Sequence, residues 1–232
     1  IQGFALHTHW ASRYGVTPTE EQKTHVQART VERILQVALG IDSSPLTVAR
    51  PLTKKFNGNC RDYSTLLCSM LRHKGIPARA RCGFGTYFRT GGFEDHWICE
   101  YWNGERWVSA DAQLDELQKT RLGVTFDTLD MPKGQFVNAS DGWRKCRAGE
   151  ADPNKFGIFE WVGLWFVRGN LLRELAALND AEMLPWDVWG LIEGTDDKLS
   201  QEDFALLDRV AQVLVSGDDD VHKLYAAEPR LQ

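Results

Sequence analysis

The chain has 232 residues, enough to bury the core of one large domain with an appendage. Its 27 basic and 32 acidic residues give a net charge of -5, so it lacks the basic surface of a nucleic-acid-binding protein. The five cysteines are odd in number and form no CxxC pair, which argues against a disulfide framework or a zinc knuckle and favours a reducing compartment. We therefore expect a cytoplasmic protein without a membrane segment, since the most apolar stretch, residues 156–167, is too short to span a bilayer.

The N-terminal part of the chain predicts a scaffold helix and then a loop. Residues 17–20 read Thr-Pro-Thr-Glu, a capping box with proline at the first helical position. Apolar residues recur at helical spacing from Val31 to Ala38, and Gly40 ends the helix. Residues 42–59 are rich in Ser, Pro, Asn and Gly, so we expect mostly loop there.

Cys60 stands at the predicted start of the next helix. It follows Gly58 and Asn59 and precedes a helical run from Ser64 to His73, which Gly75 ends. The positive end of a helix dipole favours the thiolate, which is the nucleophilic form of cysteine. This position predicts an activated nucleophile, which needs a base and an acid that orients the base.

Three strands are predicted after this helix. Residues 78–88 alternate between apolar and polar or small side chains, a pattern typical of a strand with one buried face. A second strand runs from about Asp95 to Trp102 and a third from Glu105 to Asp111. The dipeptide Asn103-Gly104 between them is a strong hairpin signal.

The chain changes character after Asp111. Residues 114–122 predict a short helix, and residues 123–153 predict a long ordered loop over the sheet. The last third predicts helices over residues 161–178, from Pro185 and from Ser200, followed by a solvated tail after Gly217. We expect an α+β core domain over residues 1–150 and a C-terminal helical extension, residues 151–232, packed on that core.

The hairpin connects a histidine with a carboxylate. A two-residue turn at Asn103-Gly104 places Trp102 opposite Glu105 and, counting along both strands, His96 opposite Asp111. Directly opposed residues have Cβ atoms about 4.5–5.5 Å apart, which allows a hydrogen bond between imidazole and carboxylate. We expect a four-residue loop to preserve this register and a three-residue loop to shift it by one and separate the two side chains.

Together, Cys60, His96 and Asp111 form a candidate catalytic triad. Cys60 is the nucleophile, His96 the base that takes its proton, and Asp111 the group that fixes the imidazole. The backbone N–H of Cys60 is the expected first donor to the oxyanion formed on attack at a carbonyl. Candidates for a second donor are Asn57, Asn59 and Trp10.

Four segments of the sequence resemble the bacterial branch of the transglutaminase-like superfamily. They are Gly58-Asn59-Cys60-Arg61-Asp62-Tyr63, Gly75-Ile76-Pro77-Ala78-Arg79, Asp95-His96-Trp97 running into Glu100-Tyr101-Trp102, and Trp107-Val108-Ser109-Ala110-Asp111. The resemblance covers about Asn57 to Gln113. It implies a papain-like thiol fold, in which the nucleophile lies on a helix packed against an antiparallel sheet that carries the other two residues.

The resemblance leaves the substrate open, because the superfamily includes amide transferases, peptidases and glycopeptide amidases. We expect a cysteine-dependent amide hydrolase or acyltransferase that acts through a thioester on a protein, peptide or small amide, with a primary amine as an optional acceptor. No cofactor, metal, nucleic acid or membrane partner is expected, and no calcium-binding loop is recognisable. The alternative is a non-catalytic protein-binding domain that retains the fold.

Other conspicuous residues have structural interpretations. Arg61 and Asp62 either tune the thiol or serve as a helix cap or an ion pair. We expect Arg79 to form a structural salt bridge. We expect the remaining cysteines to be small buried side chains; they are Cys68, Cys82, Cys99 and Cys146. The tryptophans of residues 161–165, with Trp186 and Trp189, predict core and helix packing.

Overall fold

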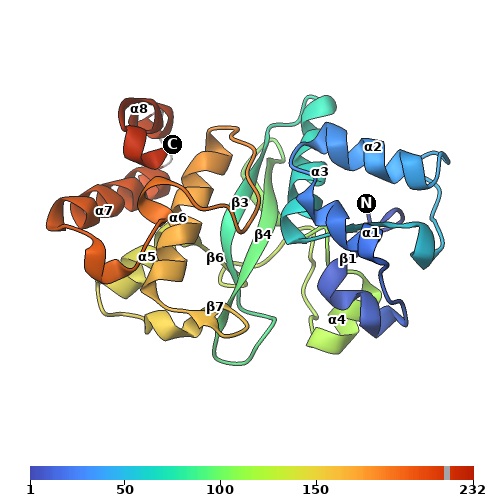
Figure 1. The fold of residues 1–232 in the computed structure, drawn as a ribbon, viewed down its shortest axis with the longest axis horizontal. Coiled ribbons are helices and arrows are strands. Elements are labelled where there is room, and N and C mark those ends of the chain that lie inside the picture. Colours follow the sequence, from blue (N-terminus) through green and yellow to red (C-terminus); the bar gives the residue numbers. More distant parts are fainter. Residues whose placement is uncertain (217–219) are drawn as a thin grey trace. The chain divides into compact units, whose positions relative to one another are not determined.

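The computed structural model describes residues 1–216 and 220–232, and these form two compact units. The first unit comprises Ile1–Ala80 and Trp97–Met131, and the second comprises Arg81–His96 and Pro132–Gln232 (Figure 1). Each unit is built from two separate stretches of the sequence. The expected division into a core domain, residues 1–150, and a helical extension, residues 151–232, stays a prediction.

The fold is α+β, as predicted. The helices are α1 (Glu20–Lys23), α2 (Val31–Ile41), α3 (Cys60–His73), α4 (Glu116–Leu122), α5 (Ala139–Arg147), α6 (Leu164–Leu178), α7 (Gln201–Ser216) and α8 (Asp220–Ala227). The strands are β1 (Ala5–His7), β2 (Phe56–Gly58), β3 (Ala78–Gly85), β4 (Phe93–Trp102), β5 (Trp107–Ala110), β6 (Phe136–Asn138), β7 (Phe156–Ile158) and β8 (Trp161–Val162). None of the helices in the described part of the chain has the length and apolar character needed to cross a bilayer.

The larger sheet has the order β6-β3-β4-β7-β8, and β5 pairs with β4. Its described pairs are antiparallel except β4 with β7, which are parallel, so the sheet is mixed and not purely antiparallel as expected. A separate parallel pair, β1 with β2, leads directly to the start of α3.

In the first unit, α3 packs on β4, as expected for the helix that carries the nucleophile. The hydroxyl of Ser64 donates a hydrogen bond to the carbonyl of Ile98 at 2.5 Å. The helix ends where predicted, because Gly75 adopts a left-handed conformation (φ 75°) that favours glycine. Helices α2 and α3 also contact each other over a buried apolar cluster that includes Ile34 and Leu66.

The N-terminal segment differs in detail from the prediction. The helix cap is Thr19, whose hydroxyl accepts the N–H of Gln22 while the Gln22 side chain accepts the N–H of Thr19. Helix α1 therefore begins after Thr19, and Pro18 precedes the cap instead of occupying the first helical position. The scaffold helix is α2, and Thr30 caps it through the N–H of Arg33 at 3.0 Å.

The β4–β5 hairpin has a four-residue loop and a register different from the predicted one. Trp102 pairs with Trp107, and Cys99 pairs with Ala110 and not with Val108. The side-chain oxygen of Asn103 accepts the N–H groups of Glu105 (3.0 Å) and Arg106 (2.9 Å), which stabilises the longer loop. Each β4 residue is therefore paired with a β5 residue two positions later than predicted. The predicted direct opposition of His96 and Asp111 is wrong. The expectation that a four-residue loop would preserve the register is also wrong.

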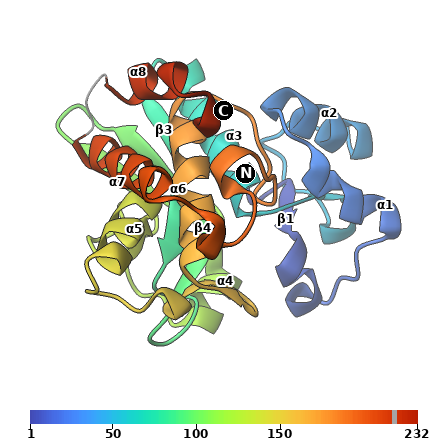
Figure 2. The ribbon, with the colours of Figure 1, turned by 60° about the vertical axis from the view of Figure 1, so that its left-hand side comes forward.

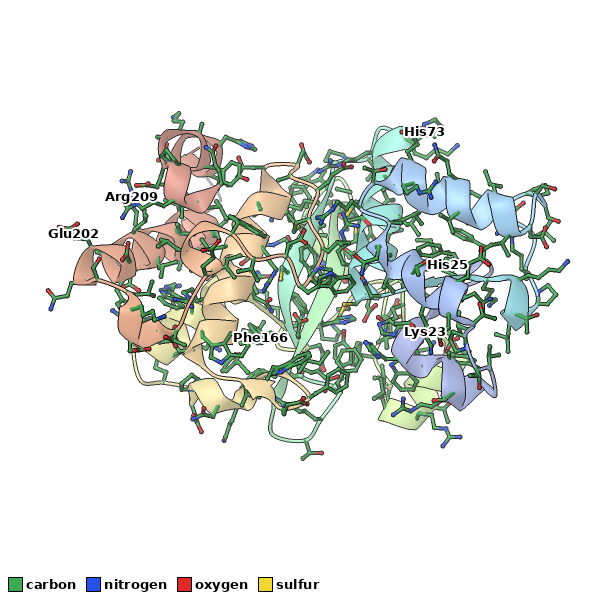
Figure 3. The ribbon with its side chains drawn as sticks, viewed as in Figure 1. Lys23, His25, His73, Phe166, Glu202 and Arg209 are labelled. Carbon is green, nitrogen blue, oxygen red and sulfur yellow. The ribbon has the colours of Figure 1, made fainter. Side chains whose placement is uncertain are left out.

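In the second unit, the C-terminal helices form a core with β3, β6 and β7. Helix α6 contacts α5, α7, α8 and β7 (Figures 1 and 2). Phe166 of α6, labelled in Figure 3, lies with its ring 6.5 Å from that of Phe84. Trp143 of α5 is fully buried, and its indole N–H donates to Asp208 of α7 at 2.7 Å.

Several predictions for the C-terminal half need correction. Residues 123–153 are not a loop throughout, because they contain β6 and α5. The piece expected from Pro185 forms only a turn, whereas α7 begins after Ser200 as predicted. Residues 217–219 of the expected solvated tail lie outside the described residues, and the following α8 buries Val221 and Leu224.

Candidate functional site

Cys60 occupies the first residue of α3 and is buried. Asn59 is the N-cap, and its side-chain oxygen accepts the N–H of Asp62 at 3.3 Å. The Asp62 carboxylate in turn accepts the N–H of Asn59 at 2.9 Å. This reciprocal capping box fixes the backbone on both sides of the thiol and confirms the cap role for Asp62.

The approach to Cys60 is also tightly packed. A side-chain carbon at Gly58 would lie 2.8 Å from the Phe56 ring and 2.9 Å from an oxygen of Asp62, so only glycine fits. His25, labelled in Figure 3, stacks on Phe56 with ring centroids 5.5 Å apart. The Nδ1 atom of His25 accepts the backbone N–H of Asn57 at 3.2 Å, so His25 contacts two successive residues of β2 just before the nucleophile.

The carboxyl group of Asp62 is almost completely buried. Burial raises its pKa to about 7, although the guanidinium of Arg61 and the N–H of Asn59 act in the opposite direction. Arg61 is buried as well, with a nitrogen 3.4 Å from an Asp62 oxygen and 3.4 Å from the carbonyl of Ala28. The carboxyl group with this raised pKa lies two residues after Cys60 in the chain.

Asp111 is buried directly after β5, in the same unit as Cys60. Its backbone N–H donates to the carbonyl of Thr128 at 2.7 Å, and its Oδ1 accepts the N–H of Gln113 at 2.9 Å. Burial raises the pKa of the Tyr63 hydroxyl on α3, and the negative charges of Asp62 and Asp111 act in the same direction. Asp111 is thus within electrostatic range of the first turn of α3.

A polar network that sequence reasoning missed extends beyond Asp111. The Gln113 amide donates to the Gln118 side chain at 3.0 Å, and Gln118 donates to the Tyr14 hydroxyl at 3.1 Å. The Tyr14 hydroxyl donates to the carboxylate of Asp115 at 2.6 Å. Asp115 is also the N-cap of α4. Tyr14 lies 104 residues from Gln118 in the sequence, so no local pattern indicates that it joins this network.

His96 lies on β4 and is the last residue of the first segment of the second unit. Its buried ring meets Phe88 with centroids 4.7 Å apart and Tyr87 with centroids 5.9 Å apart, both edge-on. Both aromatic residues follow β3, and Gly85 leaves room for their rings, since a side-chain carbon there would lie 2.8 Å from Phe88. The structure therefore confines the imidazole between two aromatic edges.

The three candidates for a second oxyanion donor have different surroundings. Trp10 lies under the guanidinium of Arg13, 4.6 Å from the ring centroid. Asn57 donates to the carbonyl of Lys55 at 3.2 Å. Asn59 uses its oxygen for the cap, while its buried amide nitrogen has no hydrogen-bond partner among the described residues.

The other predicted residues divide into confirmed and corrected ones. Arg79 forms the expected salt bridge, with Glu100 at 2.8 Å. Cys68, Cys82 and Cys99 are buried as predicted, whereas Cys146 is half-buried. The core-packing prediction is wrong for three tryptophans whose side chains are exposed, Trp161, Trp165 and Trp186, and Trp189 packs against the core of the second unit.

Comparison with known proteins finds a similarity for part of this chain. A sequence model of the transglutaminase-like superfamily matches residues 10–112, which contain all three residues of the candidate triad. No curated protein matches the sequence. Among solved structures, the chain is similar to a candidate cysteine protease from Cytophaga hutchinsonii, with 17% sequence identity and a TM-score of 0.25. That match covers 60% of this chain and 47% of the other, so this chain spans about half of that protein. A TM-score of 0.25 supports no conclusion about activity.

Proposed function

We propose that the transglutaminase-like region, residues 10–112, is the catalytic part of a cysteine-dependent amide hydrolase or acyltransferase. The observation that carries the proposal is the position of Cys60, a buried thiol at the first residue of a helix whose start is fixed by a capping box. A helix start favours the thiolate. The superfamily match over the same residues agrees with a thiol nucleophile at this position.

In the proposed reaction, the Cys60 sulfur attacks the carbonyl carbon of an amide, and His96 holds the proton of the thiol. The tetrahedral intermediate collapses when the C–N bond breaks and the imidazolium of His96 gives its proton to the departing amine. The product is a thioester on Cys60. Water or a primary amine then attacks the thioester, His96 takes the proton of the attacking group, and the thiol is released.

Asp111 serves as the orienting acid in this proposal. It is buried and in electrostatic range of the first turn of α3, and its Oδ1 is held by the N–H of Gln113. A carboxylate beside the imidazole fixes its tautomer and stabilises the imidazolium. Asp111 directly follows Ala110, the last residue of β5, which pairs with Cys99 of β4.

Two donors are proposed for the oxyanion of the intermediate. The first is the backbone N–H of Cys60, because the first N–H groups of a helix are not needed for the helical ladder. The second is the amide nitrogen of Asn59, which is buried and next to the nucleophile in the chain. A buried donor without a partner costs about 1–3 kcal/mol, a cost that binding of an oxyanion would offset.

Mass spectrometry of amide substrates tests the proposal. The full chain is incubated with glutamine-containing peptides, with and without a primary amine, alongside Cys60→Ala and a control variant, Cys146→Ala. We expect loss of ammonia, or its exchange for the amine, in the parent and in Cys146→Ala but not in Cys60→Ala. Turnover that survives in Cys60→Ala would disprove the mechanism, and a product formed only with water would exclude the transferase reaction.

A further inference from the structure

We infer that helix α6 positions the proposed catalytic histidine: Asn170 and Arg173 hold the side chain of Asp95, the residue before His96, and thereby fix this end of β4. The inference rests on the proposed function, in which His96 is the base. It gives the C-terminal helices, which lie outside the superfamily match, a part in the chemistry.

The contacts form a continuous chain within the second unit. The amide nitrogen of Asn170 donates to Oδ1 of Asp95 at 2.7 Å. The amide oxygen of Asn170 accepts from a guanidinium nitrogen of Arg173 at 3.2 Å. Asn170 and Arg173 are both buried, so these hydrogen bonds form away from bulk water, where they are stronger than at the surface.

Arg173 is itself anchored at its other end. A second guanidinium nitrogen donates to the backbone carbonyl of Asp187 at 3.0 Å, so the side chain joins α6 to the segment that follows it. Gly169, one residue before Asn170, makes room for this arrangement, because a side-chain carbon there would lie 2.7 Å from the Arg173 guanidinium. The network thus depends on a glycine in the middle of a helix, where alanine is otherwise favoured by about 1 kcal/mol.

Adjacent strand residues point to opposite faces of a sheet. Asp95 therefore faces α6, while the His96 ring lies against Tyr87 and Phe88 on the other face. Fixing Asp95 on one face limits rotation of the strand and hence movement of the imidazole on the other.

The network also compensates the burial of the Asp95 carboxyl group. Burial raises the pKa of Asp95, whereas the bond from Asn170 and the charges of Arg173 and His96 act in the opposite direction. Asn170 and Arg173 therefore favour the carboxylate form of Asp95, which accepts the hydrogen bond from Asn170.

A purely structural role would not require this polarity. Replacing a buried polar network by apolar side chains of similar volume is often neutral or stabilising, so stability alone does not explain why these side chains are polar. The rest of α6 already packs on a large apolar core that includes Leu171, Leu172 and Leu175.

The test follows the position of the His96 ring in the full chain, through the NMR resonances of its ring protons. The variants are Asp95→Asn, Asn170→Ala and Gly169→Ala, with Glu228→Gln as a control that breaks an exposed ion pair with Arg230 in the same unit. We expect the ring-proton resonances of His96 to move most in Asp95→Asn and less in the other two variants, with no change in the control. Alkylation of Cys60 at pH 6 is expected to fall several-fold in the same order.

Gly169→Ala keeps the inference testable if Asn170→Ala fails to fold, because alanine favours the helix while it displaces Arg173. Unchanged His96 ring-proton resonances in folded Asp95→Asn and Gly169→Ala would overturn the inference. Its failure differs from failure of the proposed function, in which His96→Ala would leave Cys60 alkylation unchanged whatever Asp95 does to the His96 ring.

Discussion

Asn59 and Asp62 cap each other at the start of α3, each side chain accepting the backbone N–H of the other, at 2.9 and 3.3 Å. Cys60 lies between them, at the first residue of the helix. The backbone position of the thiol therefore follows from two hydrogen bonds that are local in the sequence.

We expect Gly58→Ala to destabilise the first unit. A methyl group there would lie within 3 Å of the buried Phe56 ring and of the Asp62 oxygen that caps the helix, and overpacking of this kind costs about 1–3 kcal/mol. Gly40→Ala is the matched control, because the exposed Gly40 lies in α2 with open space around it and the change should stabilise the helix slightly. Urea denaturation of both variants checks this, and equal stability of the two would contradict the packing.

Asp62→Asn should change how stability depends on pH. The folded-state pKa of Asp62, about 7, is above that of an unfolded aspartate, so the folded state binds the proton more tightly. The resulting stabilisation is fully present below about pH 4 and is lost as the pH rises to about 7. The free energy of unfolding of Asp62→Asn, compared with that of the parent, should therefore rise between pH 4 and 7. The difference between the two should stay constant above about pH 7. Urea titrations between pH 4 and 8 measure this, and a pH-independent difference would refute the raised pKa.

Asp111→Asn should lower turnover by about two to four orders of magnitude, because the amide no longer fixes the tautomer of His96. Its oxygen can still accept the N–H of Gln113, so stability should change by less than about 1 kcal/mol. Asp130→Asn, which breaks an exposed ion pair with Arg106, is the control in the same segment. Kinetics on any amide substrate found for the parent, together with urea denaturation, provide the measurement. Unchanged kinetics in Asp111→Asn would remove Asp111 from the triad.

The buried thiols of Cys68 and Cys99 should resist alkylation in the folded protein. Their sulfur atoms are 3.1 Å apart, and the hydrogen bond from Cys68 together with burial raises the pKa of Cys99. Since the thiolate is the reactive form, neither should label at pH 7 before the chain unfolds. Peptide masses after iodoacetamide treatment, with and without urea, check this, and native labelling of either residue at the rate of Cys60 would contradict the prediction.

The local parts of the site could be predicted from sequence, and the distant contacts could not. The start of α3 is encoded in adjacent residues from Gly58 to Asp62, so both the helix and the position of the thiol follow from them. The partners of Asp95 could not be inferred, because 75 residues separate it from Asn170. Similarly, α5 has a polar sequence that suggests a loop, and it is helical because Trp143 and its neighbours pack against α7.

The β4–β5 hairpin could be predicted from the sequence only in part. Asn103-Gly104 correctly predicts a turn between β4 and β5. The loop length depends on the Asn103 side chain, which accepts two N–H groups, and this moves every pair by two residues. A shift by two keeps each side chain on its face of the sheet, so the predicted face of Asp111 survives although its predicted partner does not.

The most direct test of the proposed thiol chemistry is the pH dependence of Cys60 alkylation in the parent, in His96→Ala and in His73→Ala, whose exposed imidazole serves as the control. Peptide mass spectrometry after iodoacetamide treatment follows the label between pH 5 and 9. The account predicts that Cys60 in the parent and in His73→Ala labels well below the pKa of a free thiol, about 8.5, and that His96→Ala loses this reactivity. Labelling of Cys60 only at alkaline pH, unaffected by His96→Ala, would contradict it and favour a binding domain without catalysis.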